Sequence, residues 1–251
     1  MATLIAKKAK TARNGKARVL TPRLRRASTG NQQFAPDATL ADVQERLGGI
    51  PVSRIHLHPQ PGTATIRDLE RLDGKTLGTC ELIDGVIVEK QMGWYESLVA
   101  SVLIQILGQH VHIHRLGIVL GSDGVLRLFP QQARAPDVCF VSKRRLHQYK
   151  PSRSKPIPVL IPDLAVEVLS KSKTPKEIEL KLNQYFTSGV RLAWVIDPKH
   201  RSAVIHSSLT RRSTIELDGV LDGGKVVPGF RITLRELFDR ADQMLEDVDE
   251  E

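Results

Sequence analysis

The chain has 251 residues, which is enough for one sizeable domain with its own core. A hydrophobic fraction of 41% is ordinary for a globular protein, and no apolar run is long enough to span a bilayer, so the pattern excludes a membrane-spanning protein. Because the N-terminus lacks the apolar segment of a secretory signal, and Cys80 and Cys139 suit neither a disulfide framework nor a metal knuckle, we expect a cytoplasmic location.

The net charge of +9 comes from 37 basic and 28 acidic residues. Residues 1–30 carry nine basic residues and no acidic one, so the rest of the chain is balanced at 28 against 28. These nine residues are Lys7, Lys8, Lys10, Arg13, Lys16, Arg18, Arg23, Arg25 and Arg26. Residues 1–35 also lack an apolar period, and we predict a disordered tail there. Such a tail either binds a polyanion such as DNA or is an extension without a partner, and the sequence leaves both readings open.

Residues 36–75 are predicted to form a helical lead-in to the main domain. ATLADVQERLGG fits one short helix, and PGTATIRDLERLDGK fits another. Thr65 is placed to cap the second helix, and Gly74 to end it. The main domain is then expected over residues 76–245.

From Cys80 onward the sequence pattern predicts secondary structure more clearly. ELIDGVIVEK contains two short apolar runs joined by Asp84-Gly85, which predicts a hairpin because that turn needs positive φ. Apolar residues at helical spacing predict a helix over residues 94–109. GVLRLF and DVCFVS follow as strands, and residues 142–158, rich in Lys, Arg, Ser and Pro, are predicted to form a loop.

The second half alternates strands and helices. DLAVEVLS is predicted to be a buried strand, PKEIELKLNQYFTSGV a helix, LAWVIDP a buried strand, and SAVIHSS a strand that ends the core. GGKVVPGFRITLRELFDRA supplies a short strand and a closing helix. This order indicates an α/β or α+β domain with one central sheet.

Two carboxylates stand out in these strands. Glu167 shares a face of DLAVEVLS with Ala165 and Leu169, and both faces are otherwise apolar. A charge in such a place must be neutralised, paired or bound to a cation. Asp137 begins DVCFVS and poses the same question. The pair suits Mg²⁺ or Mn²⁺, which prefer oxygen ligands, but the pattern alone also allows Asp137 to cap a turn and Glu167 to pair with a basic residue.

Lys181 adds a third group. It lies one helical turn from Ile178 and from Tyr185, at the border of the apolar stripe of its helix. It either extends to water or reaches inward toward the strand that carries Glu167. Two carboxylates and a lysine match phosphodiester hydrolysis, in which a metal-bound water attacks and an ammonium offsets the growing charge.

Successive blocks of the chain resemble the Uma-two family of bacterial restriction-endonuclease-like proteins. These blocks are ELIDGVIVEK, APDVCFVS, PDLAVEVLS, ELKLNQYFTSGV, RLAWVIDP and GGKVVPGF, within residues 62–240. The resemblance implies the fold of the PD-(D/E)XK nuclease superfamily, with a central mixed sheet flanked by helices. It also implies Mg²⁺-dependent cleavage of DNA.

The resemblance assigns roles to individual residues. Asp137 matches the first acid of the superfamily, and Glu167 matches the second. Leu169 occupies the usual place of the lysine, and Lys181 from the following helix matches its replacement, with Lys171 and Lys173 as rivals. Glu81 matches an acidic position that could complete a metal shell with Asp137 and Glu167. Gln184 and Tyr185 are expected to line the pocket.

Two functions follow from different readings of these residues. The first is a metal-dependent DNA endonuclease with Asp137, Glu167 and Lys181 at its centre. A homodimer is compatible with this function, because its two-fold axis would match duplex DNA. The second is an inactive nucleic-acid-binding module on the same fold, which the displaced lysine favours. His110, His112 and His114 would share one face on a strand but would not converge on a helix, so we do not expect a metal site there.

Overall fold

The computed structural model describes residues 34–35, 37–72 and 79–249. The nine basic residues predicted to bind nucleic acid all lie outside these ranges, and so does Gly74. The short helices predicted in the lead-in are present as α1 (Leu40–Arg46) and α2 (Ile66–Leu72), with a 3-10 turn η1 (Val52–Arg54) between them. Thr65 caps α2 as expected, because its Oγ1 accepts a hydrogen bond from Asp68 N at 3.4 Å.

A six-stranded mixed sheet forms the centre of the main domain, in the order β10-β9-β8-β7-β6-β3. Within it β7 and β8 run parallel, and the other neighbouring strands run antiparallel. The strands are β3 (Gly117–Gly121), β6 (Val138–Ser142), β7 (Leu164–Val168), β8 (Leu192–Asp197), β9 (Ser202–His206) and β10 (Arg212–Ile215). The predicted α/β fold with a central mixed sheet flanked by helices is confirmed.

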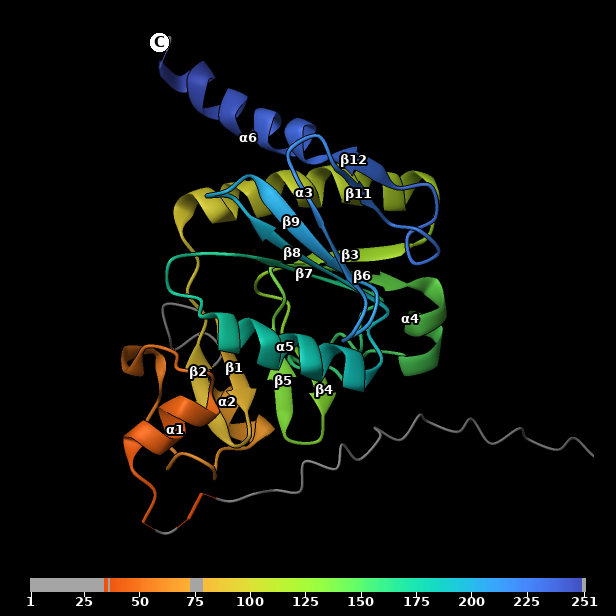
Figure 1. Cartoon of the computed structure of the whole chain (residues 1–251). Helices are drawn as coiled ribbons and strands as arrows, with labels where there is room; N and C mark the ends of the chain where they lie inside the picture. The colour runs from red at the N-terminus through yellow and green to blue at the C-terminus, as the bar shows by residue number, and fades with distance from the viewer. Residues whose placement is uncertain (1–33, 36, 73–78, 250–251) are drawn as a thin grey trace, which may run out of the picture.

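Helices cover both faces of this sheet (Figure 1). α3 (Trp94–Ile113) and α6 (Leu234–Asp249) lie over one face, where a core centred on the buried Trp194 and Val166 forms. α5 (Pro175–Ser188) connects the parallel strands β7 and β8 and packs on the opposite face. Glu167 therefore points toward α5, since it alternates with Val166 along β7.

A smaller sheet lies below α5 in Figure 1, in the order β2-β1-β5-β4. Its strands are β1 (Cys80–Ile83), β2 (Val86–Glu89), β4 (Leu126–Phe129) and β5 (Gln132–Arg134). The predicted hairpin is confirmed, with φ of 49° at Asp84 and 76° at Gly85. Gly85 is required there on two counts, because an added Cβ would also collide with the backbone of Gly62. A short pair of strands, β11 (Val220–Asp222) and β12 (Arg231–Thr233), precedes α6.

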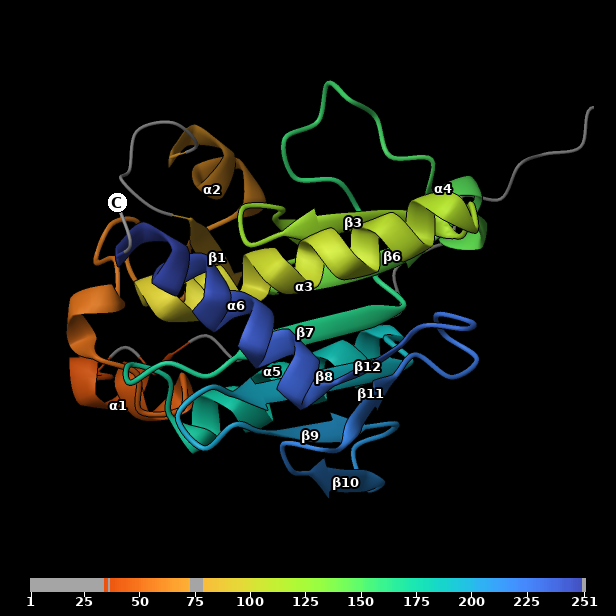
Figure 2. The ribbon, with the colours of Figure 1, turned by 90° about the horizontal axis from the view of Figure 1, so that it is seen from above.

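Some elements differ from the sequence prediction. α3 runs four residues beyond the predicted end, and residues 142–158 are not all loop, because α4 (Lys143–Tyr149) begins there. The helix was not predicted because its basic side chains suggested a loop. Ser142 caps it by accepting a hydrogen bond from Arg145 N at 3.3 Å. Figure 2 shows α4 at the far end of β3 and β6, beyond which the chain loops out before β7.

Four strands were also missed, β3, β5, β10 and β11. β3 and β5 are short, and β10 extends the sheet beyond the strand that was expected to end it. No described helix, α3 included, combines the length and apolar character needed to cross a membrane.

Candidate active site

Pairing of β6 with β7 brings the two predicted acids together. Val138 is the register partner of Val166, and Asp137 N donates to Val166 O at 3.0 Å. The Asp137 carboxylate then lies at the end of β7, where its Oδ2 accepts a hydrogen bond from Val168 N at 2.6 Å. Asp137 is fully buried and Glu167 is 1% exposed, so neither charge is relieved by water.

Lys173 bridges these two carboxylates. Its Nζ donates to Asp137 Oδ2 at 2.6 Å, to Val168 O at 2.9 Å and to Glu167 Oε2 at 3.0 Å. The side chain is 1% exposed and comes from the segment between β7 and α5. Three oxygen atoms from two adjacent strands therefore share one ammonium group.

Helix α5 contributes two further groups, four residues apart on one face. Lys181 Nζ donates to Glu167 Oε2 at 3.0 Å, and Tyr185 Oη donates to Glu167 Oε1 at 2.6 Å. Lys181 does not reach outward to water, because it is fully buried. α5 begins at the Thr174 cap and Pro175, which fixes this face toward Glu167.

Glu81 joins the same cluster from the smaller sheet. Its Oε2 accepts a hydrogen bond from Arg134 at 2.7 Å, and its Oε1 accepts one from Ala135 N at 3.0 Å and lies 3.4 Å from Lys181 Nζ. Arg134 also donates to Gln184 Oε1 at 2.7 Å. The chain passes directly from β5 to Asp137, which links Glu81 to the acids of the central sheet.

Lys90 completes the arrangement at the end of β2. Its Nζ lies 2.9 Å from Asp137 Oδ1 and donates to Ala135 O at 2.6 Å and Ser122 O at 3.3 Å. The approach to Oδ1 is an ion pair by distance, and its geometry is not that of a directed hydrogen bond. We call the seven ionised side chains the buried charge cluster: Glu81, Lys90, Arg134, Asp137, Glu167, Lys173 and Lys181.

Neighbouring cations hold Glu81 and Glu167 in their ionised form. Burial alone would raise the pKa of Glu81, but Lys181 and Arg134 outweigh it and lower that pKa from 4.5 to about 2. The pKa of Glu167 is lowered for the same reason, against the effect of burial, by Lys181 and Lys173. Burial together with the charge of Glu167 raises the pKa of Tyr185 well above its usual value, so the phenol remains a proton donor.

The lowered pKa of Glu81 predicts loss of stability in acid. A group whose pKa is lower in the folded chain stabilises it above the unfolded pKa and loses that effect as pH falls toward the folded pKa. We expect Glu81 to contribute on the order of 3 kcal/mol at neutral pH, lost as the pH falls from 4.5 to about 2. Urea unfolding across this range measures it. In Glu81→Gln the dependence of the unfolding free energy on pH should be shallower, and an unchanged slope would contradict the assignment.

The oxygen atoms around Lys173 suit a divalent cation in type. Asp137 Oδ2, Glu167 Oε2 and Val168 O already converge on one positive charge, and Mg²⁺ and Mn²⁺ prefer such oxygen ligands. Glu81 does not join this set, because it contacts Arg134 and Lys181 instead. Within the described residues no group of three or more His, Cys, Asp or Glu is arranged to hold a metal ion.

The structure thus brings Asp137, Glu167 and Lys181 together, with Glu81, Gln184 and Tyr185 around them. Of the two rival lysines, Lys173 lies at the centre and Lys171 is exposed.

Sequence reasoning did not find Lys90 or Arg134. A signal was present for Arg134, since a basic residue between Ala133 and Ala135, three positions before Asp137, needs a buried acid as its partner.

The histidines lie outside the cluster. His110 and His112 are in the last turn of α3, and His114 is its C-cap, so they do not line one strand face. The ring of His110 packs on that of His114 with centroids 4.2 Å apart, and His110 Nε2 is 3.0 Å from Pro228 O. These contacts account for His110 and His114 without a metal ion.

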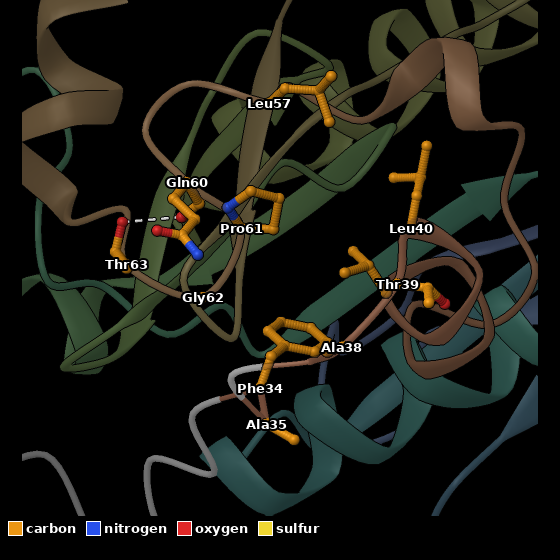
Figure 3. A pocket seen from close by; sticks show the side chains of 11 residues that line it. Phe34, Ala35, Ala38, Thr39, Leu40, Leu57, Gln60, Pro61, Gly62 and Thr63 are labelled. Atoms are coloured by element: carbon orange, nitrogen blue, oxygen red, sulfur yellow. Dashed lines mark hydrogen bonds between the residues drawn. The ribbon is translucent and has the colours of Figure 1, made fainter.

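A hollow of about 410 Å³ lies beside α1, away from the buried charge cluster (Figure 3). Phe34, Leu40, Leu57 and Pro61 form much of its wall, and a hydrogen bond from Thr63 Oγ1 to Gln60 O lies at its edge. Among the described residues that line it, none has an acidic, basic or histidine side chain. The hollow therefore offers no group for hydrolysis, and the buried charge cluster remains the candidate active site.

Comparison with known proteins agrees with this fold. A solved structure, a putative nuclease belonging to DUF820 from Anabaena variabilis ATCC 29413, has 18% identity and a TM-score of 0.62 and matches over 70% of this chain and 98% of its own. No curated protein gives a significant match. The model of the Uma2 family, described as putative restriction endonuclease, matches residues 66–235. Because this match spans most of the chain and includes every member of the buried charge cluster, the protein belongs to the Uma2 family.

Proposed function

We propose that this protein is a divalent-metal-dependent endonuclease that hydrolyses phosphodiester bonds of DNA, with its active site at the buried charge cluster. The observation that carries the proposal is the meeting of Asp137, Glu167 and Lys181 at one buried point. The acids come from adjacent strands and the lysine from α5, so the fold holds all three on rigid elements. The description of the Uma2 family supports DNA as the substrate.

Asp137 and Glu167 are the residues that would hold the metal ion, together with Val168 O. When bound, the ion supplies a water of lowered pKa and neutralises the phosphate. The hydrogen bond from Tyr185 fixes the orientation of the Glu167 carboxylate.

Lys181 is the candidate catalytic lysine. Its ammonium lies between Glu167 Oε2 at 3.0 Å and Glu81 Oε1 at 3.4 Å, so it is held from two sides. A fixed positive charge there orients the attacking water and offsets the charge that grows on the phosphate oxygens. Glu81 acts on this step through Lys181 and Arg134.

Cleavage of supercoiled plasmid by the purified chain tests the proposal. We expect nicked and linear products with Mg²⁺ or Mn²⁺ and none with EDTA, because the acids need a divalent ion to act on phosphate. Absence of cleavage by folded protein at every ion concentration would contradict an endonuclease.

A second candidate function, an inactive nucleic-acid-binding module, is favoured by the full pairing of both acids with lysines. It predicts DNA binding that weakens with salt and with removal of residues 1–30, and no turnover with any ion. Binding assays beside the plasmid assay, on the full chain and on the shortened one, separate the two functions.

A further inference from the structure

Lys173 stands where a metal ion would have to bind. Its ammonium is within hydrogen-bond distance of two carboxylate oxygens and one carbonyl oxygen, all three from the ends of β6 and β7. A set of oxygens from two acids and a main-chain carbonyl is what a hard divalent cation uses. The position cannot hold the ammonium and an ion at the same time.

The net charge of the buried charge cluster also opposes the binding of a metal ion beside Lys173. The buried charge cluster contains three carboxylates, on Glu81, Asp137 and Glu167, against four basic groups, so it carries one excess positive charge. An added divalent cation would meet like charges in a buried setting, where repulsion is strong.

A hollow beside Lys173 has room for its side chain. Lys173 lies in the segment between β7 and α5, outside any helix or strand. It lines a hollow of about 610 Å³ together with Leu169, Leu182 and His206. No other member of the buried charge cluster lines this hollow. The flexible four-carbon side chain of Lys173 can leave the three oxygen atoms and enter this hollow without any movement of β6, β7 or α5.

We propose that Lys173 is an internal cation that occupies the metal position and must leave it before a divalent ion binds. The inference rests on the proposed function, because it takes Asp137 and Glu167 as the groups that hold the ion. Departure of Lys173 leaves the cluster neutral, with three basic groups against three carboxylates, and uncovers the acids for the ion. The wild-type chain should therefore bind metal weakly, and phosphate should reach the acids only after the lysine has moved.

Mn²⁺ binding tests this directly, with free Mn²⁺ followed by electron paramagnetic resonance. Lys173→Met keeps the length of the side chain but removes the charge, and Lys171→Met makes the same change at an exposed neighbouring lysine. We expect Lys173→Met to bind Mn²⁺ at least about tenfold more tightly than wild type, because an occupant and a like charge are removed together. Lys171→Met should match wild type. Adding Glu167→Gln to Lys173→Met should abolish the gain, which places the ion at these acids.

The outcomes separate this inference from the proposed function. Equal Mn²⁺ affinity in wild type and Lys173→Met would overturn the role of Lys173 and leave a metal-dependent nuclease standing. Tighter binding without DNA cleavage would support the role of Lys173 and remove the nuclease. Absence of Mn²⁺ binding in both would overturn both.

A second measurement uses the wild-type chain and so does not depend on the folding of a variant. Acetylation of lysines should increase at Lys173 when Mn²⁺ is added, because the ammonium moves toward the hollow. Lys181 should stay protected with and without the ion. Protection of Lys173 that does not change with Mn²⁺ would overturn the proposal.

Discussion

Glu167→Gln is expected to lower DNA cleavage by about a thousandfold or more, since metal-ion catalysis contributes several kcal/mol to the transition state. Glu167 is the acid that touches both Lys173 and Lys181. The amide keeps the volume of the side chain and an acceptor for Tyr185, but it removes the charge that would hold the ion. Initial rates of plasmid nicking at saturating Mg²⁺ measure the loss.

The control for this variant is Glu45→Gln, the same change at an exposed position of α1. It should cleave like wild type. Circular dichroism must show that Glu167→Gln is folded, because the change leaves two buried lysines with one carboxylate fewer. If it does not fold, Glu167→Asp keeps the charge but retracts it, and we expect about a hundredfold loss, since small displacements at a reacting centre cost that much. Wild-type rates in folded Glu167→Gln would place the active site elsewhere.

The central sheet could be predicted because its pattern is local. DLAVEVLS is apolar on both faces, and α5 carries a clear cap and an apolar stripe, so β7 and α5 follow from a few neighbouring residues. The same reasoning required a partner for a buried Glu167 before any contact was known. β5 escaped prediction because it has only three residues, and it is held by pairing with β4 and β1.

The partners of the acids could not be derived from the sequence. Arg134 and Glu81 are 53 residues apart, and their contact depends on the pairing of β1 with β5. Both Lys173 and Lys181 follow Glu167 in the sequence, Lys173 just before α5 and Lys181 within it. Their spacing does not show which ammonium group lies between Asp137 and Glu167. The helical period placed Lys181 at the border of an apolar stripe, where a lysine can point inward or outward. Only the three-dimensional packing shows that Lys181 points inward.

Arg134→Met should lower the free energy of unfolding by about 3–5 kcal/mol, because removing one partner of a buried ion pair leaves the other charge uncompensated. Both Arg134 and Glu81 are fully buried, and the pair is 2.7 Å apart. Lys181 also lies near Glu81, at 3.4 Å, but it already pairs with Glu167. Urea unfolding measures the change. Arg240→Met, at an exposed pair with Glu236, should cost less than about 1 kcal/mol.

The double variant Glu81→Leu/Arg134→Met completes the cycle. Because apolar groups of similar size can replace a buried pair without loss, we expect it to recover most of the stability lost in Arg134→Met. A single variant within about 1 kcal/mol of wild type would contradict the assigned pairing. The recovered double variant also isolates the part that Glu81 plays in the chemistry. If its cleavage is unchanged, Glu81 serves only to neutralise Arg134; if cleavage falls while the fold is intact, Glu81 is needed to position Lys181 against Glu167.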